Sequence, residues 1–202
     1  MRLSCIGSDP AQLWERYMHK PLAGKNVAIL VASGFEELQM TEPQKALLAL
    51  GATVKLIGPE SLANGWHGDS WGHYFPVDGQ LSSTLSADYD MLLVPGGARS
   101  LIKLAQTPHT KRVVSAFVDD QKPVALVGDG VEILVIADRA EGMTVTGAPQ
   151  SQAALEGAKA QWTDEAIQIH GNVLSAKGDD IALFVSEMTS LFLGQEQVRD
   201  AA

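Results

Sequence analysis

The residues best spaced for chemistry in this chain lie between Lys122 and Leu134, in the stretch KPVALVGDGVEIL. An apolar, β-branched run at 124–127 follows a proline and predicts a buried strand, and apolar residues at helical spacing resume at Val131. The Gly-Asp-Gly turn between them exposes one position beside backbone N–H groups that can hold an anion, which is how many hydrolases present a nucleophile. That position is Gly128, which has no side chain.

Two interpretations of this turn stay open. Gly128 can be a plain turn residue, because a strained elbow costs a non-glycine residue about 1 to 3 kcal/mol and glycine is expected once no nucleophile is needed. Asp129 can act as a general base or a metal ligand, or it can simply favour the turn near a helix N-terminus, where negative charge is stabilised.

Few other side chains suggest a reactive site. His67, Asp69 and His73 are spaced as a metal site could be, but they share their segment with Gly and Ser, so we expect a surface loop and no metal or other cofactor. The single cysteine, Cys5, excludes an intramolecular disulfide and a zinc site built on thiolates. We expect Cys5 to be a bystander, because nothing near it predicts the electropositive pocket that a reactive thiol needs.

Composition excludes several classes of partner. The 202 residues are 46% hydrophobic, which suits one compact core. A net charge of −9 and a pI near 4.9 argue against a nucleic-acid partner, which would reward clustered Lys and Arg. No apolar run approaches the roughly 18 residues of a membrane span, and the first residues lack the pattern of an export signal. We therefore expect a cytoplasmic protein without a membrane partner.

Alternating strands and helices predict the fold class. We expect strands at 27–32, 54–57, 91–94, 124–127 and 143–146, a hairpin of 166–170 and 173–176, and helices at 40–50, 108–119 and 181–193. This order favours an α/β fold with a doubly wound, mostly parallel sheet sandwiched by helices, of flavodoxin-like type. Residues 64–80, rich in aromatic side chains, are expected to form an irregular excursion packed over the domain or a partner subunit.

The predicted topology also divides the chain and locates its site. We expect an N-terminal extension (1–25), a single domain (26–195) and a C-terminal tail (196–202). Ligands of such folds bind beyond the carboxyl ends of the parallel strands, where the loops 33–40, 95–99 and 128–130 should meet.

Nearly the whole chain resembles the PfpI/ThiJ superfamily of class I glutamine amidotransferase-like proteins, which includes intracellular proteases, glyoxalase III enzymes and a deglycase. The resemblance runs through the blocks GKNVAILVASGFEELQMTEP, FPVDGQL, ADYDMLLVPGG, KPVALVGDGVEIL and GNVLSAKGDD. The elbow itself is similar to that of the C-terminal domain of large-subunit catalases, which typically has no thiol.

The resemblance assigns the family's nucleophilic cysteine to Gly128, its histidine to Asp129 and its thiol-orienting glutamate to Gln39. Glu36 and Glu37 fall on the adjacent positions, which normally face away. A neutral amide cannot bias a proton equilibrium as a carboxylate does, so nucleophile and acid partner are lost together. The family often carries an aromatic hydroxyl after a Thr-Ser dipeptide. Here Thr146 and Gly147 are followed by Ala148, so this hydroxyl is missing as well.

The oxyanion-binding part of the pattern is kept. The resemblance assigns its donors to the backbone N–H groups of Gly97 and Asp129, so the pocket could still hold an anion or a carbonyl oxygen. The Asp129 carboxylate would oppose an anion there unless it is protonated or faces out.

These assignments favour a non-catalytic member of the superfamily, a pseudoenzyme that serves as a small-molecule-binding, chaperone-like or assembly module. The alternative is an enzyme with altered chemistry, of glyoxalase, deglycase, amidase or peptidase type, that uses Asp129 or Glu37 as acid or base. The resemblance also implies a homodimer or larger homo-oligomer, a small carbonyl or anionic ligand, and a role in the stress response.

Overall fold

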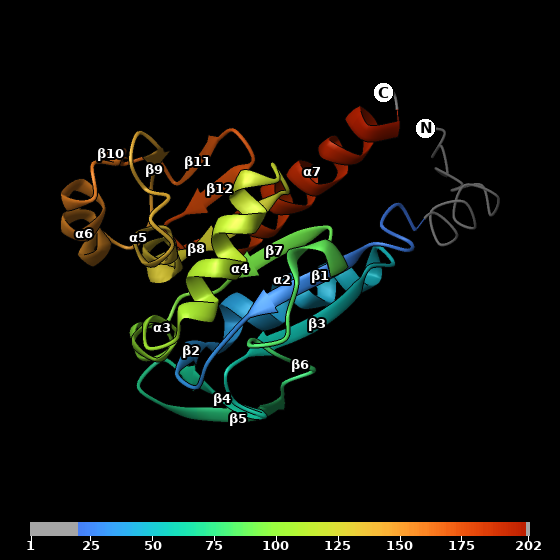
Figure 1. The fold of residues 1–202 in the computed structure, drawn as a ribbon, viewed down its shortest axis with the longest axis horizontal. Coiled ribbons are helices and arrows are strands. Elements are labelled where there is room, and N and C mark those ends of the chain that lie inside the picture. Colours follow the sequence, from blue (N-terminus) through green and yellow to red (C-terminus); the bar gives the residue numbers. More distant parts are fainter. Residues whose placement is uncertain (1–19, 201–202) are drawn as a thin grey trace, which may run out of the picture.

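A seven-stranded sheet forms the centre of the computed structural model, which describes residues 20–200, with side chains for residues 20–194 (Figure 1). Its strand order is β11-β12-β8-β7-β1-β3-β6. Their bounds are β1 Asn26–Leu30, β3 Thr53–Gly58, β6 Gly79–Gln80, β7 Met91–Val94, β8 Val124–Val127, β11 Ile167–His170 and β12 Val173–Ala176. All neighbours are parallel except β11 and β12, which form the predicted antiparallel hairpin. The predicted fold class is confirmed.

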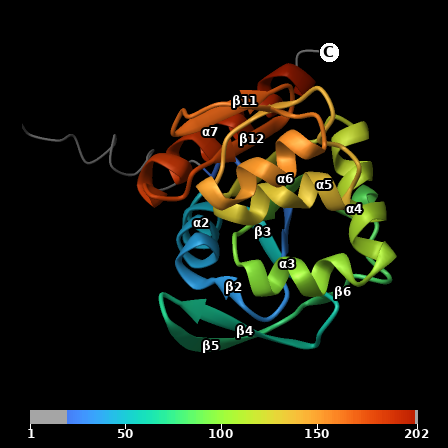
Figure 2. The ribbon, with the colours of Figure 1, turned by 90° about the vertical axis from the view of Figure 1, so that its left-hand side faces the viewer.

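Helices cover both faces of this sheet (Figure 2). One face carries α2 (Glu37–Ala49) and α7 (Ile181–Asp200), and the other carries α3 (Ala98–Ala105), α4 (Pro108–Asp119) and α5 (Ile133–Ile136). Strand β1 shows why both faces are dry: Val27 and Ile29 pack towards α2 and α7, while Ala28 and Leu30 pack towards the other helices. A strand buried on both faces is apolar throughout, which explains the uninterrupted apolar runs in the sequence.

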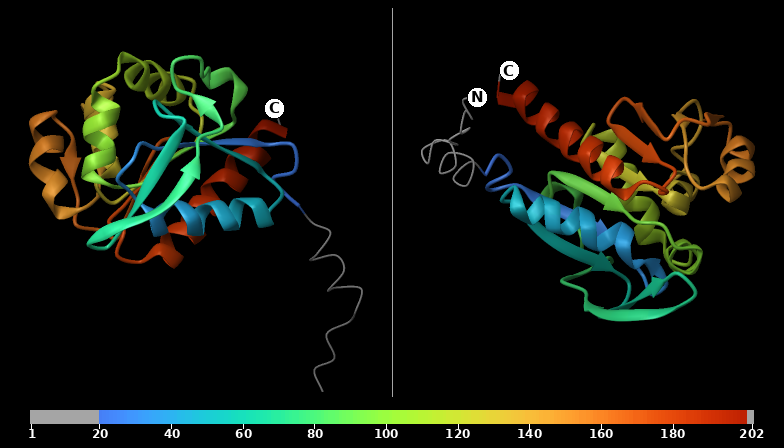
Figure 3. Two further views of the ribbon diagram at one scale, coloured as in Figure 1. Left: turned by 90° about the horizontal axis from the view of Figure 1, so that it is seen from below. Right: turned by 180° about the vertical axis from the view of Figure 1, so that it is seen from behind.

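The segment 64–80 differs from its prediction. It contributes to a regular hairpin of β4 (Leu62–His67) and β5 (Ser70–Pro76), which turns at Gly68 (φ +67°) and extends a small sheet with β2 (Phe35–Glu36). The hairpin lies beside α2 at one end of the molecule (Figure 3). Both faces of β5 are largely exposed, including Trp71 and Tyr74, so its sequence lacks the alternation by which a half-buried strand is predicted.

Helix boundaries depart from the prediction at several points. Helix α2 begins three residues earlier than expected, at Glu37, and α7 continues past Leu193 to Asp200. Helix α4 begins as predicted after Thr107, whose hydroxyl accepts a hydrogen bond from the N–H of His109 (3.3 Å). Helices α3 and α6 (Gln152–Gly157) were not predicted, nor was the short strand β10 (Gln161–Trp162) that pairs with β9 (Thr144–Val145).

The described end of the predicted N-terminal extension contacts the core. Leu22 is fully buried, and its backbone N–H donates to the carbonyl of Leu50 (3.0 Å). Cys5 lies outside the described residues. Within residues 20–200, no helix is long and apolar enough to cross a membrane.

Candidate functional site

The three predicted loops meet at the carboxyl ends of β1, β7 and β8, and two hydrogen bonds connect them. The backbone N–H of Gly96, after β7, donates to Oε1 of Gln39 on the first turn of α2 (2.9 Å). The N–H of Gly97 donates to Oδ1 of Asp129, after β8 (2.7 Å). Gly97, Gln39, Gly128 and Asp129 are therefore brought together as the sequence predicts.

The elbow keeps the backbone conformation of a strained turn. Gly128 is buried with φ at +64°, the left-handed region that glycine adopts without steric cost, and it begins a 3-10 turn (Gly128–Glu132) that continues into α5. A Cβ atom at this position would lie 3.0 Å from Oε1 and 3.1 Å from Nε2 of Gln39. The space that a side chain at 128 would enter is therefore bordered closely by the Gln39 amide.

The orientation of the Gln39 amide follows from its partner. Because Gly96 donates to Oε1, the NH₂ group must lie on the other side of the amide. There it faces Gly178, where an added Cβ would come within 2.8 Å of Nε2 and 3.3 Å of the Gly128 nitrogen. Gln39 thus has the shape and donor of a protonated glutamic acid, but it cannot release a proton.

Asp129 occupies the predicted anion-binding position with its own side chain. Its carboxylate is buried, with 8% of the residue exposed, and it accepts the Gly97 N–H that the resemblance assigns to an oxyanion. The sequence left open whether this carboxylate faces out, and the structure shows that it faces in. An external anion would have to displace a charge-assisted hydrogen bond to reach this donor.

The Glu37 side chain lies against the β4–β5 hairpin and not at the elbow. Its buried carboxylate faces the β4–β5 hairpin, where Oε2 accepts the backbone N–H of His73 (2.9 Å) and Oε1 contacts its Nδ1 (2.6 Å). Burial raises the pKa of Glu37, but the backbone N–H and imidazole of His73 together lower it more, so the net pKa lies below its ordinary value. Glu37 therefore holds the hairpin against α2 and does not point to the elbow.

Glu36 was expected to face away, and the structure places it in a cavity instead. The backbone of β2 runs parallel to β4 with Glu36 opposite Trp66, so consecutive side chains at 35, 36 and 37 diverge. Burial and the nearby charge of Asp129 raise the pKa of Glu36, although His67 and Arg99 oppose this effect. The pairing of β2 with β4 is the signal that was missing from the sequence analysis.

We name this hollow the elbow cavity; it has a volume of about 390 Å³. It is lined by residues 36, 38 and 39 at the start of α2, residues 66–68 of the hairpin, and residues 178, 179 and 181 before and in α7. Arg99 stacks over the Trp66 ring at 3.9 Å, and Trp71 meets that ring edge-on at 5.4 Å. The cavity therefore has one firm aromatic wall.

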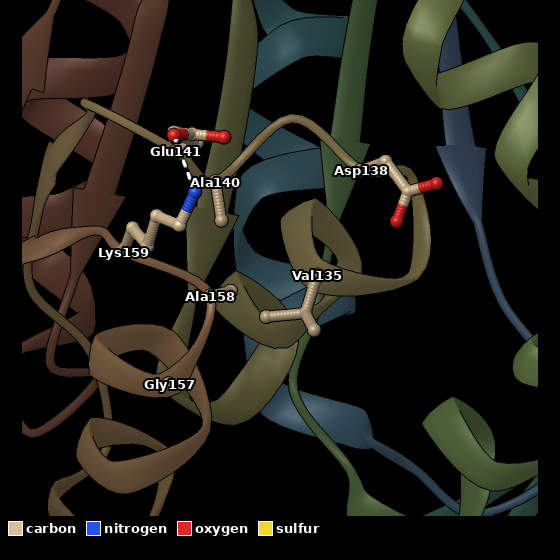
Figure 4. A pocket seen from close by; sticks show the side chains of 7 residues that line it. All are labelled: Val135, Asp138, Ala140, Glu141, Gly157, Ala158 and Lys159. Carbon is tan, nitrogen blue, oxygen red and sulfur yellow. Dashed lines mark hydrogen bonds and ion pairs between the residues drawn. The ribbon is translucent and has the colours of Figure 1, made fainter.

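A second hollow of about 340 Å³ lies away from the elbow, between α5 and α6 (Figure 4). Its only basic lining residue, Lys159, is paired with Glu141 (2.8 Å), so its charge is already compensated. As for the residues considered as metal ligands, His73 contacts Glu37 while His67 lines the elbow cavity. Within the described residues, no group of three or more His, Cys, Asp or Glu is placed to hold a metal ion.

Comparison with known proteins places this chain in a family. A profile of the DJ-1/PfpI family matches residues 25–191. YraA of Bacillus subtilis (strain 168), which carries a cysteine-protease name, is 31% identical over 171 residues, covering 83% of this chain and 98% of YraA. General stress protein 18 of the same organism is 30% identical over 172 residues, with the same coverage of both chains.

Solved structures agree with this assignment. A two-domain protein from Anabaena variabilis with DJ-1/ThiJ/PfpI-like and ferritin-like domains superimposes with a TM-score of 0.77 at 26% identity, over 82% of this chain and 47% of that protein. DJ-1 of Schizosaccharomyces pombe shares the fold with a TM-score of 0.70 at 20% identity, over 82% of this chain and 90% of that one. The chain described here therefore belongs to the DJ-1/PfpI family.

Proposed function

We propose that this protein is a DJ-1/PfpI member that works without covalent catalysis, as a binding or assembly module. One observation carries the proposal: the chain's own side chains border the position of a nucleophile and fill that of an oxyanion. The Gln39 amide lies against the space beside Gly128, and the Asp129 carboxylate accepts the Gly97 N–H.

The elbow lacks the nucleophile and the carboxylate partner of a covalent mechanism, and one of its two assigned oxyanion donors is already used. Attack on a carbonyl requires a nucleophile, a base or charge that activates it, and a free donor for the developing oxyanion. Gly128 has no side chain, Gln39 cannot accept a proton as a carboxylate does, and the Gly97 N–H is already used. Activities carried by the names of relatives, such as cysteine protease, therefore do not extend to this elbow.

The test is turnover of methylglyoxal and of chromogenic peptide amides by the wild-type chain and by a Cys5→Ser variant. We expect no turnover above buffer in either. The double variant Gly128→Cys, Gln39→Glu in the Cys5→Ser background should introduce a thiol that reacts with iodoacetamide well below pH 8, because a protonated carboxyl group at position 39 would donate a hydrogen bond to the thiolate and the backbone N–H groups of the turn stabilise negative charge. Turnover of methylglyoxal by the Cys5→Ser variant would refute the proposal.

A second candidate, an enzyme with altered acid–base chemistry, is favoured by one observation. Glu36 lies in a cavity beside the elbow with its pKa raised by burial and by Asp129. Of the two groups named for this role by the sequence, Glu37 is bound to His73 and Asp129 to Gly97. A turnover that disappears in Glu36→Gln would favour this candidate over the binding module.

Homo-oligomerisation, a cytoplasmic location and a role in the stress response remain part of the proposal. They are supported by family membership and by the name of the stress-protein relative. Exposed Trp71 and Tyr74 on β5, with 53% and 66% of their surface accessible, offer apolar area to a second chain. Sedimentation analysis of the full chain tests the assembly.

A further inference from the structure

The charges around the elbow cavity are predominantly acidic. Its lining includes the carboxylates of Glu36 and Asp179, with Asp129 close enough to affect the pKa of Glu36. Its lining contains no Lys or Arg, and His67 is its other titratable group. Arg99, whose charge acts on Glu36 from outside this lining, stacks on the Trp66 ring at 3.9 Å.

Glu36 is the unusual member of this set. Its side chain is half-buried, yet within residues 20–194 it makes no hydrogen bond and no ion pair, and it does not cap the helix that it precedes. A carboxylate partly removed from water and left beside another carboxylate is unfavourable unless a cation accompanies it. Its neighbour Glu37 shows that the same loop can satisfy a carboxylate fully.

Anions are disfavoured by the same geometry. The Gly97 N–H, which would hold an anion at the elbow, is occupied by Asp129. The NH₂ group of Gln39 is a neutral donor without an acceptor among the described residues, so it can receive one oxygen of a ligand but cannot compensate a full negative charge.

The remaining walls are apolar. Trp66, Leu38 and Ile181 line the cavity, and its volume of about 390 Å³ lies in the range of small-molecule sites. A ligand that suits it therefore has an apolar body and a positive group directed at Glu36.

We propose that the elbow cavity binds a small organic ammonium compound, with Glu36 and Asp179 as counter-charges and Trp66 as the apolar wall. The inference rests on the proposed function, because it takes the elbow to be closed to thiol chemistry and assigns the ligand class of the cavity above it. Selection for a cation follows from the Glu36 and Asp179 carboxylates and from a lining without Lys or Arg, and the same charges disfavour an anion.

The experiment is calorimetric titration of the full chain at neutral pH and low salt with three probes of one shape: benzylammonium, benzyl alcohol and benzoate. We expect benzylammonium to bind about tenfold more tightly than benzyl alcohol, a difference of roughly 1.4 kcal/mol. Saturable binding of benzoate is not expected.

Two variants distinguish binding by the carboxylates of the cavity from attraction by the overall negative charge of the protein. Glu36→Gln should reduce the affinity for benzylammonium to that for benzyl alcohol and leave the latter unchanged. Glu141→Gln removes the same charge from the exposed ion pair with Lys159 and should change neither affinity. Equal loss in both variants, equal binding of the cation and the alcohol, or tighter binding of benzoate would each overturn the inference.

A methylglyoxal assay on the same samples keeps the two proposals apart. Turnover together with cation-selective binding would refute the proposed function and leave the ligand class standing. Cation-selective binding without turnover supports both, and absence of both turnover and selective binding refutes the ligand class alone.

Discussion

Glu36 and Glu37 are adjacent in the chain and lie in opposite environments. On the hairpin side, the carboxylate of Glu37 is satisfied by the backbone and imidazole of His73, and its pKa is lowered overall. On the elbow side, the carboxylate of Glu36 is unpaired within the described residues, and its pKa is raised. Glu37 therefore stabilises the fold, whereas the fold holds Glu36 in an environment that is unfavourable for its charge. A charged group held unfavourably is the usual sign of a functional position.

The first prediction concerns how tightly Gln39 closes the elbow side. Gly128→Ala should lower the free energy of unfolding by about 3 kcal/mol, because it combines an unfavourable left-handed alanine with crowding against Gln39. Gly171→Ala is the matched control, since Gly171 has φ at +60° but open space around its Cβ position, and it should cost about 1 kcal/mol. Urea denaturation measures both, and equal losses would show that Gln39 does not crowd the elbow.

The second prediction concerns the hairpin side. Glu37→Ala should lower the free energy of unfolding by about 2 kcal/mol, because it removes charge-assisted hydrogen bonds to His73 from a buried position. Glu36→Ala should cause no such loss, since that carboxylate has no partner to lose. A comparable loss in the Glu36 variant would remove the contrast between the two glutamates.

The loss of unfolding free energy in Glu37→Ala should depend on pH, with a definite sign. The folded-state pKa of Glu37 lies below the ordinary value of 4.5, so its stabilisation is present above pH 4.5 and is lost as the pH falls through the lower folded-state pKa. The gap between wild type and Glu37→Ala in urea denaturation should therefore narrow as the pH falls below 4.5. A gap that stays constant down to pH 2 would contradict the shift.

The third prediction concerns Glu36→Gln, which should change stability least and should raise it, whereas Glu37→Ala lowers it. The folded-state pKa of Glu36 lies above 4.5, so its penalty is absent at lower pH and grows as the pH rises through the folded-state value. Glu36→Gln should therefore raise the melting temperature at pH 7 by roughly 1 to 2 °C and leave it unchanged at pH 4. Glu141→Gln serves as the control, because its exposed carboxylate is paired with Lys159. Equal melting temperatures for wild type and Glu36→Gln at pH 7 would contradict the idea that the Glu36 charge destabilises the folded protein.

Much of the fold was predictable from apolar runs. The strands at 91–94 and 124–127 match their predicted bounds, because a strand covered on both faces must be apolar throughout. The β4–β5 hairpin was not predictable in this way, since Trp71 and Tyr74 are exposed and glycines interrupt the strands. Its regularity comes from backbone pairing, which leaves little trace in side-chain pattern.

The site was predictable in position and not in orientation. The loops that bring Gln39, Gly97 and Gly128 together follow from strand order alone. The direction of the Asp129 carboxylate and the exposure of Glu36 to the cavity depend on contacts between segments far apart in sequence. Local patterns carry no information about such contacts, so both facts required the structure.

The left-handed turn at Gly128 has a consequence for how this chain can change over generations. Its backbone still holds the shape that a reactive side chain would need, but the Gln39 amide now occupies the adjoining space. A lone Gly128→Cys substitution would thus crowd the Gln39 amide, and a side chain at 128 would need a compensating change at 39. Positions 39 and 128 are therefore expected to change together.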